Sequence, residues 1–89
     1  MRGYRQTLGD KFSEGSRQMW TQIEKRGWSM ADLTRAMNWA PGMAYRYLFG
    51  DRRPDHLMTL RIEAVLGIAP KSFLEPPKRK FAPPAARAA

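Results

Sequence analysis

The sequence predicts an all-α fold, a compact bundle of about five short helices. Apolar residues recur at helical spacing, first in Met19, Trp20 and Ile23. Residues that favour helix N-caps precede such stripes, and glycines that favour the left-handed C-terminal position follow them. The chain has 89 residues, which is enough for one domain.

The first predicted helix begins at about Ser13 or Ser16 and ends at Arg26. Gly27 follows it as a helix stop, and Lys25 and Arg26 lie in the last turn, where cations interact favourably with the helix dipole.

The second predicted helix has the clearest local signature. Ser29 is a natural N-cap, and Asp32 lies three residues later, which makes the acidic form of a capping box. We expect the helix to end near Met37 and to bury one face that comprises Leu33, Ala36 and Met37.

The third predicted helix spans about residues 41–49. Asn38 tolerates a left-handed turn before it, and Pro41 suits the first helical position because its missing N–H is not needed there. Gly50 ends the helix. The residues spaced for burial are Ala44, Tyr47 and Leu48.

A fourth helix is predicted from about Asp55 to Leu66, followed by a short helix from Pro70 to Leu74 that places Phe73 and Leu74 against the core. The chain therefore divides into three parts. These are a flexible basic arm (1–12), a helical domain (13–75) and a disordered tail rich in Pro, Ala and basic residues (76–89).

The charge distribution indicates an anionic partner. The formal net charge is +8, and the sequence pI is about 10.6. Residues 1–12 carry +2, residues 13–75 carry +2 and residues 76–89 carry +4, so the ends hold most of the excess. Basic ends on a small domain are typical of a nucleic-acid binder.

Several other classes of function find no support in the sequence. The chain has no Cys, and its one His, His56, has no acidic cluster near it, so we expect no metal site and no cofactor. No nucleophile has a positioned base, so we expect neither an enzyme nor a small-molecule substrate. No apolar run is long enough for a signal or a membrane span, so we expect a cytoplasmic, nucleoid-associated protein.

Residues 28–54 have the layout of a helix-turn-helix, two short helices joined by a tight turn and followed by a basic loop. Residues 16–74 resemble the lambda-repressor-like, Cro-type (XRE) helix-turn-helix domains. The residues that carry the resemblance are Gly27-Trp28-Ser29, Leu33 and Met37, Tyr47-Leu48, Gly50 through Pro54, and Leu66-Gly67-Ile68.

The sequence departs from the family pattern at three places. Met30 replaces a Gln that helps to hold a phosphate, and Ala40-Pro41-Gly42 replaces a Ser or Thr cap and a polar base reader. Phe49 replaces an Asn that donates to a phosphate. The resemblance thus implies a divergent member whose DNA contacts are redistributed.

The resemblance implies that the third helix enters the major groove of an operator, with the candidate base-reading positions Pro41, Gly42, Met43, Tyr45 and Arg46. The Arg46 guanidinium matches the acceptors of guanine; a phosphate clamp or a salt bridge with Asp51 or Asp55 is the alternative. Tyr45 either contacts DNA or packs beside Trp39, and Met43 either contacts a thymine methyl or belongs to the core.

The candidate phosphate contacts are Arg52 and Arg53, which directly follow the third helix, and Arg35 on the second. The terminal segments add the candidate arm contacts Arg2, Arg5, Lys78, Arg79 and Lys80.

The leading hypothesis is a sequence-specific regulator of transcription, of bacterial or phage type, that binds double-stranded DNA as a homodimer on an inverted repeat. Ile68, Phe73 and Leu74 are candidates for the dimer patch, although they suit burial within the monomer equally well. Two alternatives remain open. One is a protein-interaction module, such as an antitoxin or co-regulator, and the other is a non-specific nucleic-acid binder driven by the basic ends.

Overall fold

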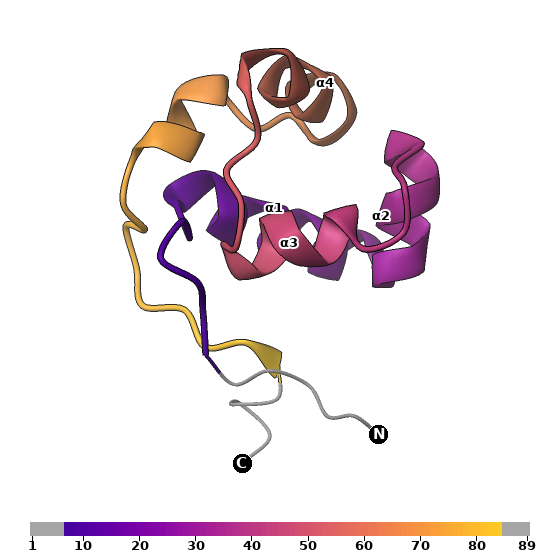
Figure 1. Ribbon diagram of the computed structural model, residues 1–89. Coiled ribbons are helices and arrows are strands. Elements are labelled where there is room, and N and C mark those ends of the chain that lie inside the picture. The colour runs from indigo at the N-terminus through magenta and orange to yellow at the C-terminus, as the bar shows by residue number, and fades with distance from the viewer. Residues whose placement is uncertain (1–6, 85–89) are drawn as a thin grey trace.

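The computed structural model describes residues 7–84, and this part of the chain is all-helical, with no strand. Figure 1 shows α3 crossing in front of α1, with α2 at one end of it and α4 above. The predicted count of about five helices is met only if the 3-10 helix η1 is included. In order, the elements are α1 (Glu14–Arg26), α2 (Met30–Met37), α3 (Met43–Phe49), α4 (His56–Leu66) and η1 (Pro70–Leu74).

Side-chain caps begin α1, α2 and α4, and those at Ser29 and Asp55 lie where the sequence indicates them. Ser13 rather than Ser16 is the N-cap of α1: its hydroxyl accepts from the Ser16 N–H, and the Ser16 hydroxyl accepts from the Ser13 N–H. Ser29 and Asp32 form the predicted capping box of α2. Asp55 caps α4 by accepting from the Met58 N–H at 2.8 Å. These local hydrogen bonds satisfy donors that helix geometry leaves unpaired.

The start of α3 differs from the prediction. Pro41 is not its first residue, because residues 40–42 form a turn in which the Met43 N–H donates to the Ala40 carbonyl at 3.2 Å. Gly42 has φ of +89°, which is outside the helical region. The helix therefore begins at Met43, and its N-cap, Gly42, makes no side-chain hydrogen bond.

The core lies between the four α-helices and η1, and its central side chains are fully buried. Two predictions about burial are wrong: Ala36 is exposed, and Leu74 is 76% exposed instead of packing on the core. Of the two η1 residues expected to pack on the core, only Phe73 is buried. The buried hydrophobic residues are Met19, Trp20, Ile23, Leu33, Met37, Trp39, Ala44, Tyr47, Leu48, Phe49, Ile62, Leu66, Ile68 and Phe73.

The described parts of both flanking segments contact the helical core at several residues, whereas disordered ends were expected; most of their other residues are exposed. The Gly9 N–H donates to the Phe49 carbonyl at 2.7 Å, and the Lys11 N–H donates to the Gly50 carbonyl at 2.8 Å. Figure 1 shows this segment beside the C-terminal one, which we call the strap (residues 75–83). The Phe12 and Phe81 rings stack across the two segments, with centroids 5.3 Å apart.

Among residues 7–84, no helix has the length and apolar composition that crossing a membrane requires.

Candidate nucleic-acid interface

The turn between α2 and α3 is fixed from α4. Trp39 is buried; its indole N–H donates to the Met58 sulfur at 3.1 Å, and its ring lies 5.1 Å from that of Tyr47. The Arg61 guanidinium donates to the Met37 carbonyl at 2.6 Å, where α2 ends. Asn38 has φ of +56°, as the sequence predicted. The end of α2 and the turn that precedes α3 are therefore held by contacts with α4.

The five candidate base-reading residues lie on or just before α3, and none is fully buried. Pro41, Gly42 and Arg46 are exposed, whereas Met43 and Tyr45 are half-buried and pack against the edge of the core. Met43 thus contacts the core, one of its two expected roles, and part of its side chain stays accessible.

Tyr45 does not pack beside Trp39; that place is taken by Tyr47. The Tyr45 ring instead stacks on Phe49, with centroids 4.5 Å apart. Phe49 meets the edge of Trp20 at 5.4 Å, and Trp20 lies 5.5 Å from Phe81. These rings and Phe12 form a continuous row that runs from α3 to the strap, and we call it the aromatic row.

Three arginines are exposed at the C-terminal half of α3 and in the loop after it: Arg46, Arg52 and Arg53. The Asp51 and Arg52 N–H groups both donate to the Arg46 carbonyl, at 2.9 and 3.3 Å, so the loop folds back against this turn of α3. Within residues 7–84, no salt bridge engages these three arginine side chains. Arg46 therefore does not form the expected alternative pair with Asp51 or Asp55.

Arg52 also acts electrostatically on the core of the motif. Burial raises the pKa of the Tyr47 hydroxyl, while the nearby Arg52 charge opposes that rise and the Asp55 charge adds to it. The positive charge of Arg52 is thus close to α3 as well as open to solvent.

Arg35 is engaged by a neighbour. Its guanidinium pairs with the Asp32 carboxylate one turn earlier on α2, although its side chain remains 71% exposed. The Ser29 backbone N–H, followed by the Ser29 hydroxyl and Arg35, lowers the pKa of Asp32. Because exposed ion pairs are weak, a phosphate is able to compete for Arg35, but this arginine is less available than the three near α3.

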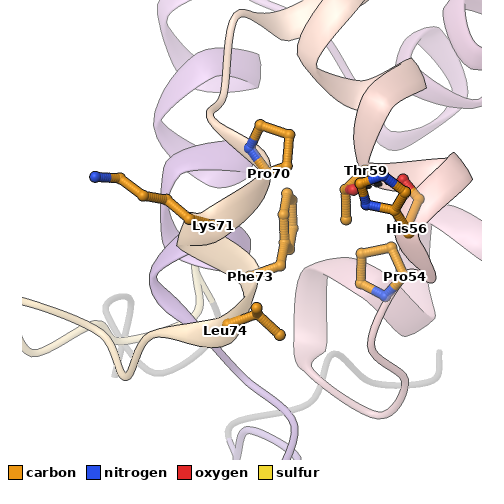
Figure 2. Close-up of a pocket in the computed structure, with 7 residues that line it drawn as sticks. All are labelled: Pro54, His56, Thr59, Pro70, Lys71, Phe73 and Leu74. Carbon is orange, nitrogen blue, oxygen red and sulfur yellow. Dashed lines mark hydrogen bonds between the residues drawn. The ribbon is translucent and has the colours of Figure 1, made fainter.

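Two of the three residues assigned to a dimer patch are inside the protomer. Ile68 and Phe73 are each 1% exposed, so they cannot form an exposed patch, and burial within the monomer is the correct alternative. Leu74 remains exposed. It lines a pocket of about 290 Å³ between η1 and the start of α4. Figure 2 shows Phe73 in the middle of the residues that line this pocket. Pro70 and Lys71 lie on one side of its ring, and His56, Thr59 and Pro54 lie on the other.

The remaining candidate contacts lie in the terminal segments. Lys78, Arg79 and Lys80 are exposed on the strap. Arg2 and Arg5 lie outside the described residues. In the part of the chain between residues 7 and 84, His, Asp and Glu side chains form no group that is able to hold a metal ion.

Sequence reasoning missed Arg61, Met58, Glu14 and Phe81, which hold the interface in place. Each contacts a residue far away in the chain, so no local spacing indicates the contact.

Comparison with known proteins identifies no family for this chain. No family model, no curated protein and no solved structure matches it.

Proposed function

We propose that the protein is a sequence-specific double-stranded DNA binder that regulates transcription. The observation that carries the proposal is the exposed cationic surface at α3, where Arg46, Arg52 and Arg53 have no salt-bridge partner within residues 7–84. A short helix that is fixed by its buried side and exposed on the other is the geometry with which helix-turn-helix proteins enter the major groove.

The proposed roles follow from chemistry and position. Arg46 reads guanine, because its guanidinium donates two hydrogen bonds to O6 and N7. Arg52 and Arg53 bind the flanking phosphates, and the accessible part of Met43 contacts a thymine methyl. Gly42 has no side chain and no atom within 4 Å of its missing Cβ, so backbone can approach DNA closely there.

Phe49 supports the interpretation of a divergent family member. At the position where the family has an Asn that donates to a phosphate, this chain has a buried phenyl ring that packs against Trp20. A phenyl ring has no hydrogen-bond donor for a phosphate. In our proposal the neighbouring loop, which carries Arg52 and Arg53, holds the DNA backbone instead.

We further propose a homodimer on an inverted repeat, with half-sites about 34 Å apart, the length of one turn of DNA. Because Ile68 and Phe73 are buried, the exposed leucines Leu57, Leu60 and Leu74 are better placed to form the contact between protomers.

Selection of bound fragments from a random duplex library at about 150 mM salt tests the proposal, because non-specific binding is weak at that salt concentration. We expect an enriched palindrome, and we expect Arg46→Ala to lose discrimination at one base pair by about 1–3 kcal/mol. If no sequence is enriched and all binding disappears as salt rises, the protein is a non-specific binder and the proposal is wrong.

One observation favours a second candidate, a protein-interaction module. Leu57 is 72% exposed and Leu60 is 41% exposed, and they lie one turn apart on α4. Exposed apolar surface of this kind is typical of contacts with proteins. If no duplex is selected from the random library, and Leu57→Ser with Leu60→Ser abolishes a complex with a different protein in the cell, the second candidate replaces the first.

A further inference from the structure

We propose that the strap is a built, fixed phosphate-binding surface, on which Lys78, Arg79 and Lys80 contact the DNA backbone beside the groove that α3 occupies. This inference rests on the proposed function, since it names a second contact with the same duplex. It differs from the expectation of a disordered basic tail, because the structure anchors the chain on both sides of the three basic residues.

The first anchor is polar and lies at the start of α1. The Glu14 side chain is 1% exposed, and its Oε1 accepts a hydrogen bond from the Lys78 N–H at 2.8 Å. Arg17 Nε donates to the same oxygen at 2.8 Å, and Gln18 donates to Oε2 at 2.9 Å. The Glu14 N–H in turn donates to the Glu75 carbonyl at 2.8 Å.

The electrostatics of this anchor favour the charged carboxylate. The hydrogen bond from Arg17, with those from Gln18 and the Lys78 backbone, outweighs the opposing effect of burial and lowers the pKa of Glu14 to about 2. At neutral pH the carboxylate is therefore ionised. A charge-assisted hydrogen bond holds the Lys78 backbone and leaves its ammonium group in solvent.

The second anchor is apolar and follows the basic residues. Phe81 stacks on Phe12 at 5.3 Å and lies 5.5 Å from Trp20. Pro83, two residues later, is buried. Ring packing of this kind removes apolar surface from water at the one large apolar side chain of the tail. Because the backbone is held at Glu75 and Lys78 on one side and Phe81 packs on the other, the three basic residues form a short surface loop.

The aromatic row places this loop relative to α3. Trp20 contacts both Phe81 of the strap and Phe49 of α3, and its indole N–H donates to the Leu48 carbonyl at 2.7 Å. Phe81 of the strap and the C-terminal end of α3 thus pack against the same Trp20 side chain. A duplex docked on α3 has its backbone on either side of the groove, which is within reach of long cationic side chains at this place.

Two matched variants test the inference. Lys78→Ala with Lys80→Ala removes two lysines from the strap, and Lys25→Ala with Lys71→Ala removes two lysines from other exposed positions. We expect the first pair to reduce the slope of log K against log salt on any duplex by about 1 to 2, since each phosphate contact contributes about 0.9. We expect the control pair to leave the slope almost unchanged.

Phe81→Ala tests whether the anchoring matters, because it keeps every charge. A loosened strap has to be ordered upon binding, so we expect duplex affinity to fall about threefold or more, with Phe81→Tyr as the control that keeps the ring. In the free protein, the Lys78 amide should exchange slowly with solvent and should lose this protection in Phe81→Ala.

The outcomes separate this inference from the proposed function. Rapid exchange of the Lys78 amide in the wild-type protein would contradict a fixed strap, and equal salt slopes for the two lysine pairs would contradict phosphate binding by it. Either result overturns this inference even if a palindrome is selected. If no palindrome is selected but the strap pair alone lowers the slope, the specific regulator is wrong and the phosphate-binding strap stands.

Discussion

The consecutive helices α2 and α3 are defined by different kinds of interaction. At the start of α2, the Ser29 hydroxyl accepts from the Asp32 N–H at 3.1 Å and the Ser29 N–H donates to Asp32 at 2.8 Å. α3 begins after Gly42 with no side-chain cap. Four of its seven residues are buried instead, namely Ala44, Tyr47, Leu48 and Phe49.

The difference shows which residues determine the position of each helix. The start of α2 is specified by residues next to it in the sequence, whereas α3 is positioned by partners far away, such as the Trp20 indole on the Leu48 carbonyl and the Gly9 N–H on the Phe49 carbonyl. A substitution at the start of α2 should therefore leave the exposed side of α3, which we propose contacts DNA, in place. A substitution in the core beneath α3 should disrupt that surface.

The largest effect should come from the core beneath α3. Leu48 is fully buried, so we expect Leu48→Ala to lower the free energy of unfolding by about 2–5 kcal/mol, a large part of the stability of a small domain. Glu63→Gln, at an exposed residue on α4, is the control and should change it by less than about 0.5 kcal/mol. Urea denaturation measures both; equal losses would contradict the assignment of the core.

The next effect concerns the end of α3. A Cβ on Gly50, where φ is +77°, would lie 2.4 Å from the Phe12 N and Cα atoms, so we expect Gly50→Ala to cost roughly 2–3 kcal/mol. Gly67→Ala is matched, since φ there is +73° and nothing lies within 4 Å. The difference in unfolding free energy between the two variants isolates the contact with Phe12, and its absence would show that the N-terminal segment is not packed there.

A third effect depends on pH and tests the polar anchor of the strap. The folded-state pKa of Glu14 is lowered from 4.5 to about 2, so its stabilisation is fully present above pH 4.5 and is lost as pH falls through 2. We expect the wild-type protein to lose up to about 3 kcal/mol more than Glu14→Gln over that interval. Urea denaturation at a series of pH values measures the difference. If the unfolding free energies of the two proteins fall in parallel as pH is lowered, the Glu14 carboxylate does not make the hydrogen bonds described above.

The smallest effect should be at the cap of α2. Ser29→Ala removes the acceptor for the Asp32 N–H, and we expect it to cost about 1 kcal/mol, whereas Ser29→Asn should retain most of the stability. Duplex affinity should be nearly unchanged in both variants. A large loss of affinity in Ser29→Ala, measured under conditions where the protein remains folded, would show that the two helices are not independently defined.

The sequence predicted what is encoded locally and missed what is encoded over long distances. Ser29, Asp55 and the helix-ending glycines are short-range signals, and the structure has them where they were expected. The start of α3 was misplaced because Pro41 suits a turn as well as a first helical turn.

The strap was missed because a tail rich in Pro and Lys has the composition of a disordered segment, and composition does not show a contact between Glu14 and Lys78. The lone Phe81 within that tail was the one available signal. The candidate surface on α3 follows from the motif alone, whereas which of its residues contact DNA depends on packing, as the different partners of Tyr45 and Tyr47 show.

The most direct test of the central claim is an NMR titration of the ¹⁵N-labelled protein with the duplex selected from the random library. We expect the largest amide shifts at residues 42–46 and 51–53, smaller ones along the strap, and little change at Leu57 and Leu60 on α4. Shifts concentrated at these leucines with none on α3 would contradict the account, because DNA would then be bound by a different face.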